Sequence, residues 1–265
     1  MQVLSIQDLS CLGKCSLTVA LPILSCMGLS ATALPTAVLS THTAFPEPVC
    51  HSFTDQLGKI ANHWASIGAS FDAISVGYLS DPRQAEAVAQ VLELFPALKV
   101  IDPAMGDHGR LYSGMTEQNV EAMKVLCRKG DYLLPNLTEA ALLTGNPYRE
   151  DLDEAYLQSL IDGLMDFGIK GVVITGISWD PETTGFAGYH KDTGLIVYRT
   201  KRIPRQSHGT GDMFCAVTVG ALTKGESLAA AATRAAKFVE QVILATPEAT
   251  PFGANFEAVL PTLMK

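Results

Sequence analysis

The sequence predicts an α/β protein built on a mainly parallel sheet. Strand-like segments alternate with helical patterns along most of the 265 residues, and the strands at 73–76, 98–101 and 172–174 are nearly continuous apolar runs. Such runs are typical of parallel strands, because helices cover both faces of the sheet. The chain length and the 48% hydrophobic composition suit one large core, so we expect residues 1–265 to form a single domain.

The first part of the chain contains two expected strands and two expected helices. A buried strand is predicted at 3–7, a helix at about 15–27 and an extended segment at 32–39. A second helix is predicted by five apolar residues that fall on one helical face: Phe53, Leu57, Ile60, Trp64 and Ile67. We interpret this face as core rather than as a cofactor site.

The middle of the chain repeats the alternation of strand and helix. Strands are predicted at 73–78, 98–101, 132–134 and 172–174. Helices are predicted at 81–95, 116–128 and 153–167, and a short helix is predicted after Asn136 that ends at Leu143. Strands and helices at this spacing indicate βαβ units.

The pattern changes after Thr175. Residues 185–203 alternate between polar and apolar side chains and contain the turn 191–194, which predicts a β-hairpin rather than another βαβ unit. Helical patterns return from Gly211 and are strongest at 229–245.

Charge and cysteine content exclude several classes of protein. The net charge is −8 and the basic residues cluster only at 201–205, so nucleic acid is not an expected partner. The N-terminus lacks a basic leader, and the early apolar stretch at 17–24 is too short to cross a bilayer, so we expect a soluble, cytoplasmic protein without a membrane partner. The six cysteines are scattered, which favours reduced thiols over disulfides or a metal site.

Residues 209–212 form a candidate anion site. Gly209 and Gly211 bracket Thr210 just before a helical pattern, so backbone N–H groups can converge at a helix N-terminus. Asp212 lies in the first turn, where the helix dipole favours an ionised carboxylate that can accept a proton from a hydroxyl attacking a phosphate. The alternative is an ordinary turn followed by an acidic residue in the first turn of a helix.

Polar residues follow several predicted strands. They lie at 7–8, 77–78, 102–107 and 135–139. In an open α/β sheet, ligands bind at the carboxyl ends of the strands, so we expect these segments to line one crevice. Asp102, Asn136 and Glu139 carry the hard oxygen donors that can hold Mg²⁺ through its waters. The alternative is that they serve as turns and caps, with Asn136 capping the helix that begins near Thr138.

Two common phosphate-binding motifs are absent. The sequence has no Gly-x-x-x-x-Gly-Lys-Ser/Thr run and no Gly-x-Gly-x-x-Gly after a strand. P-loop and Rossmann dinucleotide sites are therefore excluded, and the segment at Gly209 remains the candidate anion site.

Taken together and in order, six segments resemble the pyridoxal kinase branch (pyridoxal/pyridoxamine kinases) of the ribokinase-like, PfkB-type superfamily. The segments are 3–7, 40–43, 77–79, 102–107, 135–139 and 209–212, within a resemblance that runs from about residue 3 to residue 245. The resemblance implies a three-layer α/β/α sandwich with a central, mainly parallel sheet and a small β-hairpin near the ATP site. It also implies a homodimer that uses ATP and Mg²⁺ and transfers the γ-phosphoryl group to the 5′-hydroxyl of pyridoxal, pyridoxine or pyridoxamine. Whether a monovalent cation is also required is left open by the resemblance.

The resemblance also assigns roles to individual residues. It makes Asp212 the catalytic base and the backbone amides of Gly209, Thr210 and Gly211 an anion hole. The implied ATP-binding residues are Asp102, Asp107, Tyr112, Asn136, Thr175 and Arg202, and the implied metal residues are Asp102 and Glu139. The implied substrate-binding residues are Asp8, Cys15, Thr43 and Tyr78.

One position departs from the better-known family members, and two other functions stay open. Asp8 stands where those members have Ser, and an acid there can pair with a protonated pyridine nitrogen or with the amine of pyridoxamine. The first alternative is a hydroxymethylpyrimidine (phosphate) kinase of the same superfamily, although those enzymes usually have Cys at the position of Asp212. The second is a non-catalytic B6-vitamer carrier or sensor.

Overall fold

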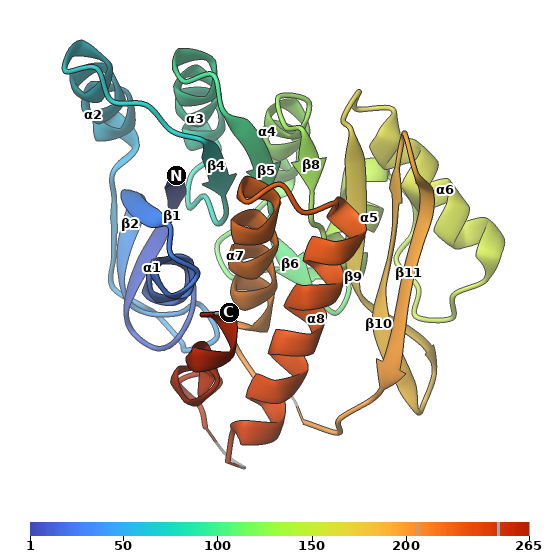
Figure 1. Ribbon diagram of the computed structural model, residues 1–265. Helices are drawn as coiled ribbons and strands as arrows, with labels where there is room; N and C mark the ends of the chain where they lie inside the picture. Colours follow the sequence, from blue (N-terminus) through green and yellow to red (C-terminus); the bar gives the residue numbers. More distant parts are fainter. Residues whose placement is uncertain (206, 248–249, 265) are drawn as a thin grey trace.

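The computed structural model describes residues 1–205, 207–247 and 250–264. Across these ranges a nine-stranded sheet runs through the molecule in the order β11-β10-β9-β8-β5-β4-β1-β2-β3 (Figure 1). Its strands are β1 (Gln2–Leu12), β2 (Ser30–Thr41), β3 (Cys50–Ser52), β4 (Ala73–Val76), β5 (Leu98–Ile101), β8 (Tyr132–Leu133), β9 (Gly171–Asp180), β10 (Thr183–His190) and β11 (Gly194–Lys201). A separate two-stranded ribbon consists of β6 (Gly106–Asp107) and β7 (Arg110–Leu111).

Helices cover both faces of the sheet. They are α1 (Leu17–Cys26), α2 (Thr54–Ser66), α3 (Arg83–Leu94), α4 (Glu117–Cys127), α5 (Leu137–Thr144), α6 (Glu154–Met165), α7 (Thr210–Thr223) and α8 (Leu228–Ala245), with short 3₁₀ turns η1 (Phe256–Ala258) and η2 (Leu260–Leu263). One apolar core lies between one face of the sheet and the five helices from α2 through α6. A second apolar core lies between the opposite face of the sheet and α1, α7, α8 and the two 3₁₀ turns (Figure 1). The predicted three-layer α/β/α sandwich is confirmed.

The central strands are parallel, as the apolar runs predict. The pairs β2–β1, β1–β4, β4–β5, β5–β8 and β8–β9 are all parallel. Every residue of β4 is buried, because helices lie over both of its faces. The carboxyl ends of these strands therefore lie along one edge of the sheet, where the N-terminus of α7 also lies (Figure 1).

The predicted hairpin is present and forms part of a larger antiparallel unit. β10 pairs with β11 from Thr183–Lys201 to His190–Gly194, and Gly194 has φ 80°, the left-handed conformation that such a turn requires. The strand predicted at 172–174 is longer than expected: β9 continues to Asp180 and pairs antiparallel with β10.

The first two strands extend further than the sequence predicts. β1 was expected to end at Gln7 but continues to Leu12, paired with β2 as far as Thr41. β3 was not predicted and adds an antiparallel edge strand to β2. Ile67, assigned to the buried face of the second helix, lies past the end of α2 and is 66% exposed.

No helix in the described part of the chain has the length and apolar character needed to cross a membrane.

Phe186 tests the packing of the hairpin against the sheet's helical layer. Its side chain is 1% exposed, and its ring lies 5.5 Å from that of Tyr198 and 5.9 Å from that of Phe214 on α7. We expect Phe186→Ala to lower the free energy of unfolding by about 3–5 kcal/mol through lost burial and the cavity left behind. Urea unfolding measures the change. As a control, Leu195→Ala on the exposed face of β11 should change it by less than about 0.5 kcal/mol, and equal effects would contradict the packing described.

Candidate active site

The N-terminus of α7 is an open turn of backbone amides. Gly209 precedes the helix with φ 84°, and a side chain there would collide with the carbonyl oxygen of Lys14. Glycine is therefore required at this position. Gly211 differs, because a Cβ atom there would have no protein atom within 4 Å. The space beside Gly211 is thus left free for a ligand, as an anion site at a helix N-terminus requires.

Asp212 lies in the first turn of α7. Loss of hydration and, to a smaller extent, the negative charge of Asp8 raise its pKa to about 7, against the opposing effect of a hydrogen bond from the backbone of Ser16. Burial therefore opposes the helix dipole, which favours the ionised carboxylate, and a pKa of about 7 leaves both protonation states populated near neutral pH. A carboxyl with a pKa of about 7 exchanges its proton readily at neutral pH.

Asp102 follows β5 and lies close enough to Asp212 to be affected by its charge. Loss of hydration and then the charge of Asp212 raise its pKa to about 8. Its backbone N–H donates to the carbonyl of Val76, which fixes the chain at the strand end. Within the described residues, no hydrogen bond reaches its carboxylate, so both oxygens remain available to a ligand.

Glu139 and Asn136 form a capping box at the start of α5. The Asn136 side chain accepts from the Glu139 N–H at 2.9 Å, and the Glu139 carboxylate accepts from the Asn136 N–H at 2.8 Å and the Met105 N–H at 3.1 Å. The Asn136 amide also donates to the carbonyl of Gly106 at 2.8 Å. Both residues therefore cap the helix, which is the alternative to metal binding that the sequence analysis left open for them. They also hold the loop after Asp102 in place.

The carboxylates fit a divalent cation held partly through water. In the ranges that the structure describes, no group of three or more His, Cys, Asp or Glu side chains is arranged to hold a metal by itself. Glu139 is 2% exposed, and burial together with the charge of Asp102 raises its pKa well above the usual range. The charge of Asp102 thus disfavours that of Glu139, and the charge of Asp212 disfavours that of Asp102, and a cation relieves both effects. Asp102 has the free oxygens to face it.

Three of the four predicted substrate residues lie together at the other end of the crevice. Asp8 is 3% exposed and accepts a hydrogen bond from the Ser10 hydroxyl at 2.8 Å. Its charge adds to burial in raising the pKa of Tyr78 to about 12, and burial, Asp212 and Asp8 raise the pKa of Cys15 to about 12. Thr43 lies half-buried in the loop after β2, and the structure does not link it to Asp8.

The predicted nucleotide residues lie at different distances from the carboxylates. Tyr112 is half-buried, and burial followed by the charges of Glu139 and Asp102 raises its pKa. Thr175 forms a parallel bridge with Asn136. Asp107 is exposed on the β6–β7 ribbon. Arg202 follows directly after β11, and its guanidinium donates to the hydroxyl of Ser178 on β9. The structure therefore brings Tyr112 and Thr175 to the site, holds Asp107 close enough for its charge to act on Tyr112 and His208, and leaves Arg202 on the exposed segment after β11.

A ring cluster that the sequence analysis did not assign supports the anion turn. His42 is buried, its Nε2 lies 3.2 Å from the Pro251 carbonyl, and its ring lies 4.6 Å from that of His208 and 4.8 Å from that of Phe45. His208 immediately precedes Gly209. The C-terminal segment therefore packs against the turn from outside, a long-range contact that leaves no periodic signal in the sequence.

The comparisons with known proteins agree with this geometry. A family model described as phosphomethylpyrimidine kinase matches residues 24–258. The chain belongs to this family. The pyridoxal kinase resemblance within the ribokinase-like fold is confirmed by similar proteins and structures.

Three members of the family are informative. A pyridoxine/pyridoxal/pyridoxamine kinase of Bordetella bronchiseptica is 30% identical over 264 residues, which cover 93% of this chain and 90% of that protein. A Bacteroides thetaiotaomicron structure, described as a phosphomethylpyrimidine kinase by inference and obtained in a form with pyridoxal, has a TM-score of 0.93 and 37% identity, covering 100% of this chain and 96% of that chain. Pyridoxal kinase from Leishmania donovani with ADP and pyridoxamine has a TM-score of 0.87 and 26% identity, covering 99% and 95%.

Asp102→Asn is expected to stabilise the free protein at alkaline pH. The folded pKa of about 8 lies above the unfolded value of 3.8, so the wild type loses stability as pH rises between these values. The neutral amide does not lose stability in this way. The difference in Tm should be small at pH 4 and grow towards pH 8.5, by about 2–4 °C for each kcal/mol of repulsion removed.

The control for this measurement is Asp151→Asn at an exposed position. Its Tm should follow the wild type at every pH. A constant or negative shift for Asp102→Asn would contradict the electrostatic account.

Proposed function

We propose that this chain is a kinase that transfers the γ-phosphoryl group of ATP to the 5′-hydroxyl of the B6 vitamers pyridoxal, pyridoxamine and pyridoxine, in the salvage of pyridoxal 5′-phosphate. One observation carries the proposal: a carboxyl with a pKa of about 7, Asp212, lies beside the open amides of Gly209 to Gly211 at a helix N-terminus. The names of the relatives, and the pyridoxal and ADP of the similar structures, support the same reaction.

Asp212 and the anion turn divide the chemistry between them. Asp212 in its ionised form accepts the proton of the 5′-hydroxyl as that oxygen forms a bond to the γ-phosphorus and the bond to ADP breaks. The amides of Gly209, Thr210 and Gly211 face the charge that develops on the transferred phosphoryl group. The open space beside Gly211 leaves room for that group.

The nucleotide is assigned to the Asp102 side of the crevice. We assign ATP contacts to Asp102, Asp107, Tyr112, Asn136, Thr175 and Arg202. Mg²⁺, held by Asp102 and Glu139, neutralises charge on the phosphates when bound. A monovalent cation beside Asp107 and Tyr112 is compatible with this arrangement. Arg202 lies on the exposed segment after β11, so its contact requires ATP to extend outward from the carboxylates.

The vitamer is assigned to the Asp8 side. Tyr78 offers its ring to the pyridine, and Cys15 and Thr43 complete the pocket. Asp8 pairs with the protonated ring nitrogen or, in pyridoxamine, with the amine. The continuous nine-stranded sheet supports one domain over residues 1–265. A homodimer belongs to the same proposal and rests on the resemblance alone, whereas a cytoplasmic location rests on the scattered cysteines, which favour reduced thiols.

The second candidate is a hydroxymethylpyrimidine or phosphomethylpyrimidine kinase. The description of the matching family model favours it, and its substrate is also a flat ring that carries a hydroxymethyl group. A B6 carrier without activity would have no need for Asp212 beside an open anion turn. Phosphorylation of the three vitamers and of hydroxymethylpyrimidine, each with Mg·ATP, separates these functions: reaction of the pyrimidine alone selects the second candidate, and vitamer binding without turnover selects the carrier.

Removal of the Asp212 carboxylate should stop catalysis but not binding. Asp212→Asn is expected to lower kcat about 10²- to 10⁴-fold, because the amide cannot accept the substrate proton. In the wild type, kcat/KM should rise with pH and level off above about 7, as Asp212 loses its proton. Steady-state rates between pH 5.5 and 9 measure both effects.

Asp55→Asn is the matched control, because Asp55 also lies in the first turn of a helix but is exposed. It should keep wild-type rates. If Asp212→Asn retained activity, or if the wild-type profile were flat through pH 7, Asp212 would not be the base.

Asp8 should influence the choice among vitamers. If its carboxylate pairs with the amine of pyridoxamine, Asp8→Ser should lower kcat/KM for pyridoxamine relative to pyridoxal by about 10-fold, which is the loss of one charge-assisted hydrogen bond. The KM for ATP should not change. An unchanged ratio of the two vitamers would show that Asp8 does not contact the amine.

A further inference from the structure

The pairing of β1 with β2 is interrupted at Asp8. Gln7 lies opposite Pro35 and Leu9 lies opposite Val38, so β2 carries one extra residue across from Asp8. This is a β-bulge, a feature that re-aims side chains beside functional sites. Thr36 lies in the bulge, and it is fully buried.

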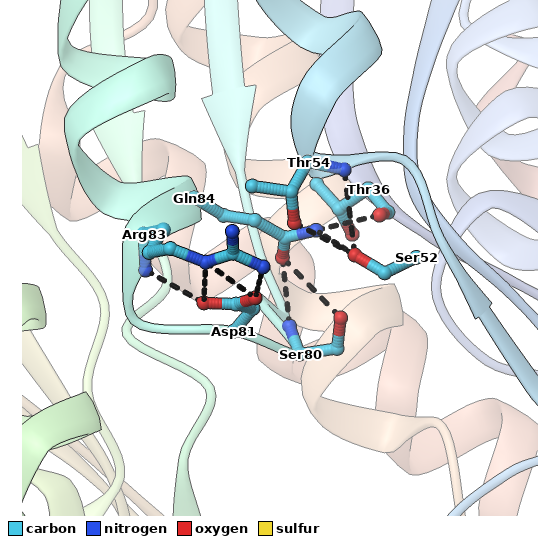
Figure 2. A network of polar contacts seen from close by, with 7 residues as sticks. All are labelled: Thr36, Ser52, Thr54, Ser80, Asp81, Arg83 and Gln84. Carbon is cyan, nitrogen blue, oxygen red and sulfur yellow. Dashed lines mark hydrogen bonds and ion pairs between the residues drawn. The ribbon is translucent and has the colours of Figure 1, made fainter.

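Gln84 on α3 is hydrogen-bonded to the bulge and to β3. Its side chain is 0% exposed and its amide nitrogen donates to the Thr36 carbonyl at 2.7 Å and to the Ser52 hydroxyl at 3.2 Å. Its carbonyl oxygen accepts from the Ser80 N–H at 2.8 Å. Figure 2 shows the Gln84 side chain reaching between Ser80 on one side and Thr36 and Ser52 on the other.

The same network holds the turn into α3. Arg83 pairs with Asp81 at 2.6 Å, and the Arg83 N–H donates to the Asp81 carboxylate at 2.9 Å (Figure 2). The segment from Ser80 to Gln84 is therefore fixed at both ends. A buried amide with every polar atom satisfied is rigid, because any movement leaves a desolvated group without a partner.

Thr36 links this network to the candidate vitamer pocket. Its hydroxyl donates to the carbonyl oxygen of Tyr78 at 2.9 Å, while its own carbonyl accepts from the Gln84 amide and from the Phe53 N–H at 2.9 Å. Gly77, which precedes Tyr78, passes close to Gln7, because a Cβ atom on Gly77 would lie 2.6 Å from the Gln7 amide oxygen. The position of Tyr78 thus depends on Thr36, and that of Thr36 on Gln84.

We propose that Thr36 and Gln84 are positioning residues that fix Tyr78 against the bound ring and so set the affinity for the flat aromatic alcohol, without contacting it. The inference rests on the proposed function for the identity of the ring. A positioning role can be told apart from a purely structural one, because the network contacts only the Tyr78 side of the site. Within the described chain it makes no hydrogen bond to Asp102, Asn136 or Glu139. Its loss should therefore weaken binding of one substrate and not of the other.

Thr36→Val removes the hydroxyl at nearly constant volume and is the principal test. We expect KM for pyridoxal to rise about 2- to 10-fold, the effect of one hydrogen bond, with KM for ATP unchanged. Gln84→Met should act in the same direction. Ser52→Ala removes the hydroxyl that accepts from Gln84, at an exposed position where the substitution should leave folding unchanged. It should raise the KM for pyridoxal about 2-fold.

The matched controls are Thr218→Val and Ser66→Ala. Thr218 is also fully buried, but its hydroxyl has no partner among the described residues, and Ser66 is exposed with its hydrogen bond at the end of α2. Both should keep the wild-type KM for pyridoxal. An unchanged KM in Thr36→Val and Ser52→Ala, or equal changes for pyridoxal and ATP, would overturn the proposal.

Wild-type assays keep this test separate from the proposed function. If the wild type phosphorylates hydroxymethylpyrimidine alone, the same KM comparison is made with that ring. If it phosphorylates none of these alcohols, the Kd of pyridoxal is measured from its near-ultraviolet absorbance, and the same 2- to 10-fold weakening is expected in Thr36→Val. Failure of the wild type to bind pyridoxal or the pyrimidine would overturn the proposal as well.

Discussion

Four carboxyl groups held in one poorly hydrated crevice dominate this structure. Asp8, Asp102, Glu139 and Asp212 come from four separate segments, and burial raises the pKa of every one of them. No lysine or arginine forms an ion pair with them in the described part of the chain. The free protein therefore retains repulsion that a simple structural core would not tolerate, as is common where charge is kept for a ligand.

The parallel sheet brings these groups together, and that part was predictable. Apolar strands that alternate with helices require a covered sheet, and the polar residues after those strands then share one edge. The expected convergence of Asp8, Tyr78, Asp102 and Glu139 follows from this rule. The same reasoning located the anion turn, since two glycines before a helix are visible in sequence.

The sequence did not indicate how each group is tuned. Ser10 lies two residues beyond Asp8 on the same strand face, a relation that was hidden because the strand was expected to end at Gln7. Gln84 lies within a predicted helix, where its amide looks like any surface glutamine. Its role depends on the bulge at Thr36, and bulges have no dependable sequence signature. The pKa of Asp212 is raised mainly by burial in three dimensions, which the sequence does not show.

The carboxylates also connect the two ends of the crevice. The charge of Asp8 raises the pKa of Asp212, and the charge of Asp212 raises that of Asp102. A positive charge at either end must therefore favour the ionised form of Asp212, because opposite charges lower a carboxyl pKa. Substrates that bring such charges, a protonated pyridine beside Asp8 and a metal–nucleotide complex beside Asp102, would each promote the form of Asp212 that accepts a proton. Repulsion that lowers the stability of the free protein would thus prepare the base only when the site is filled.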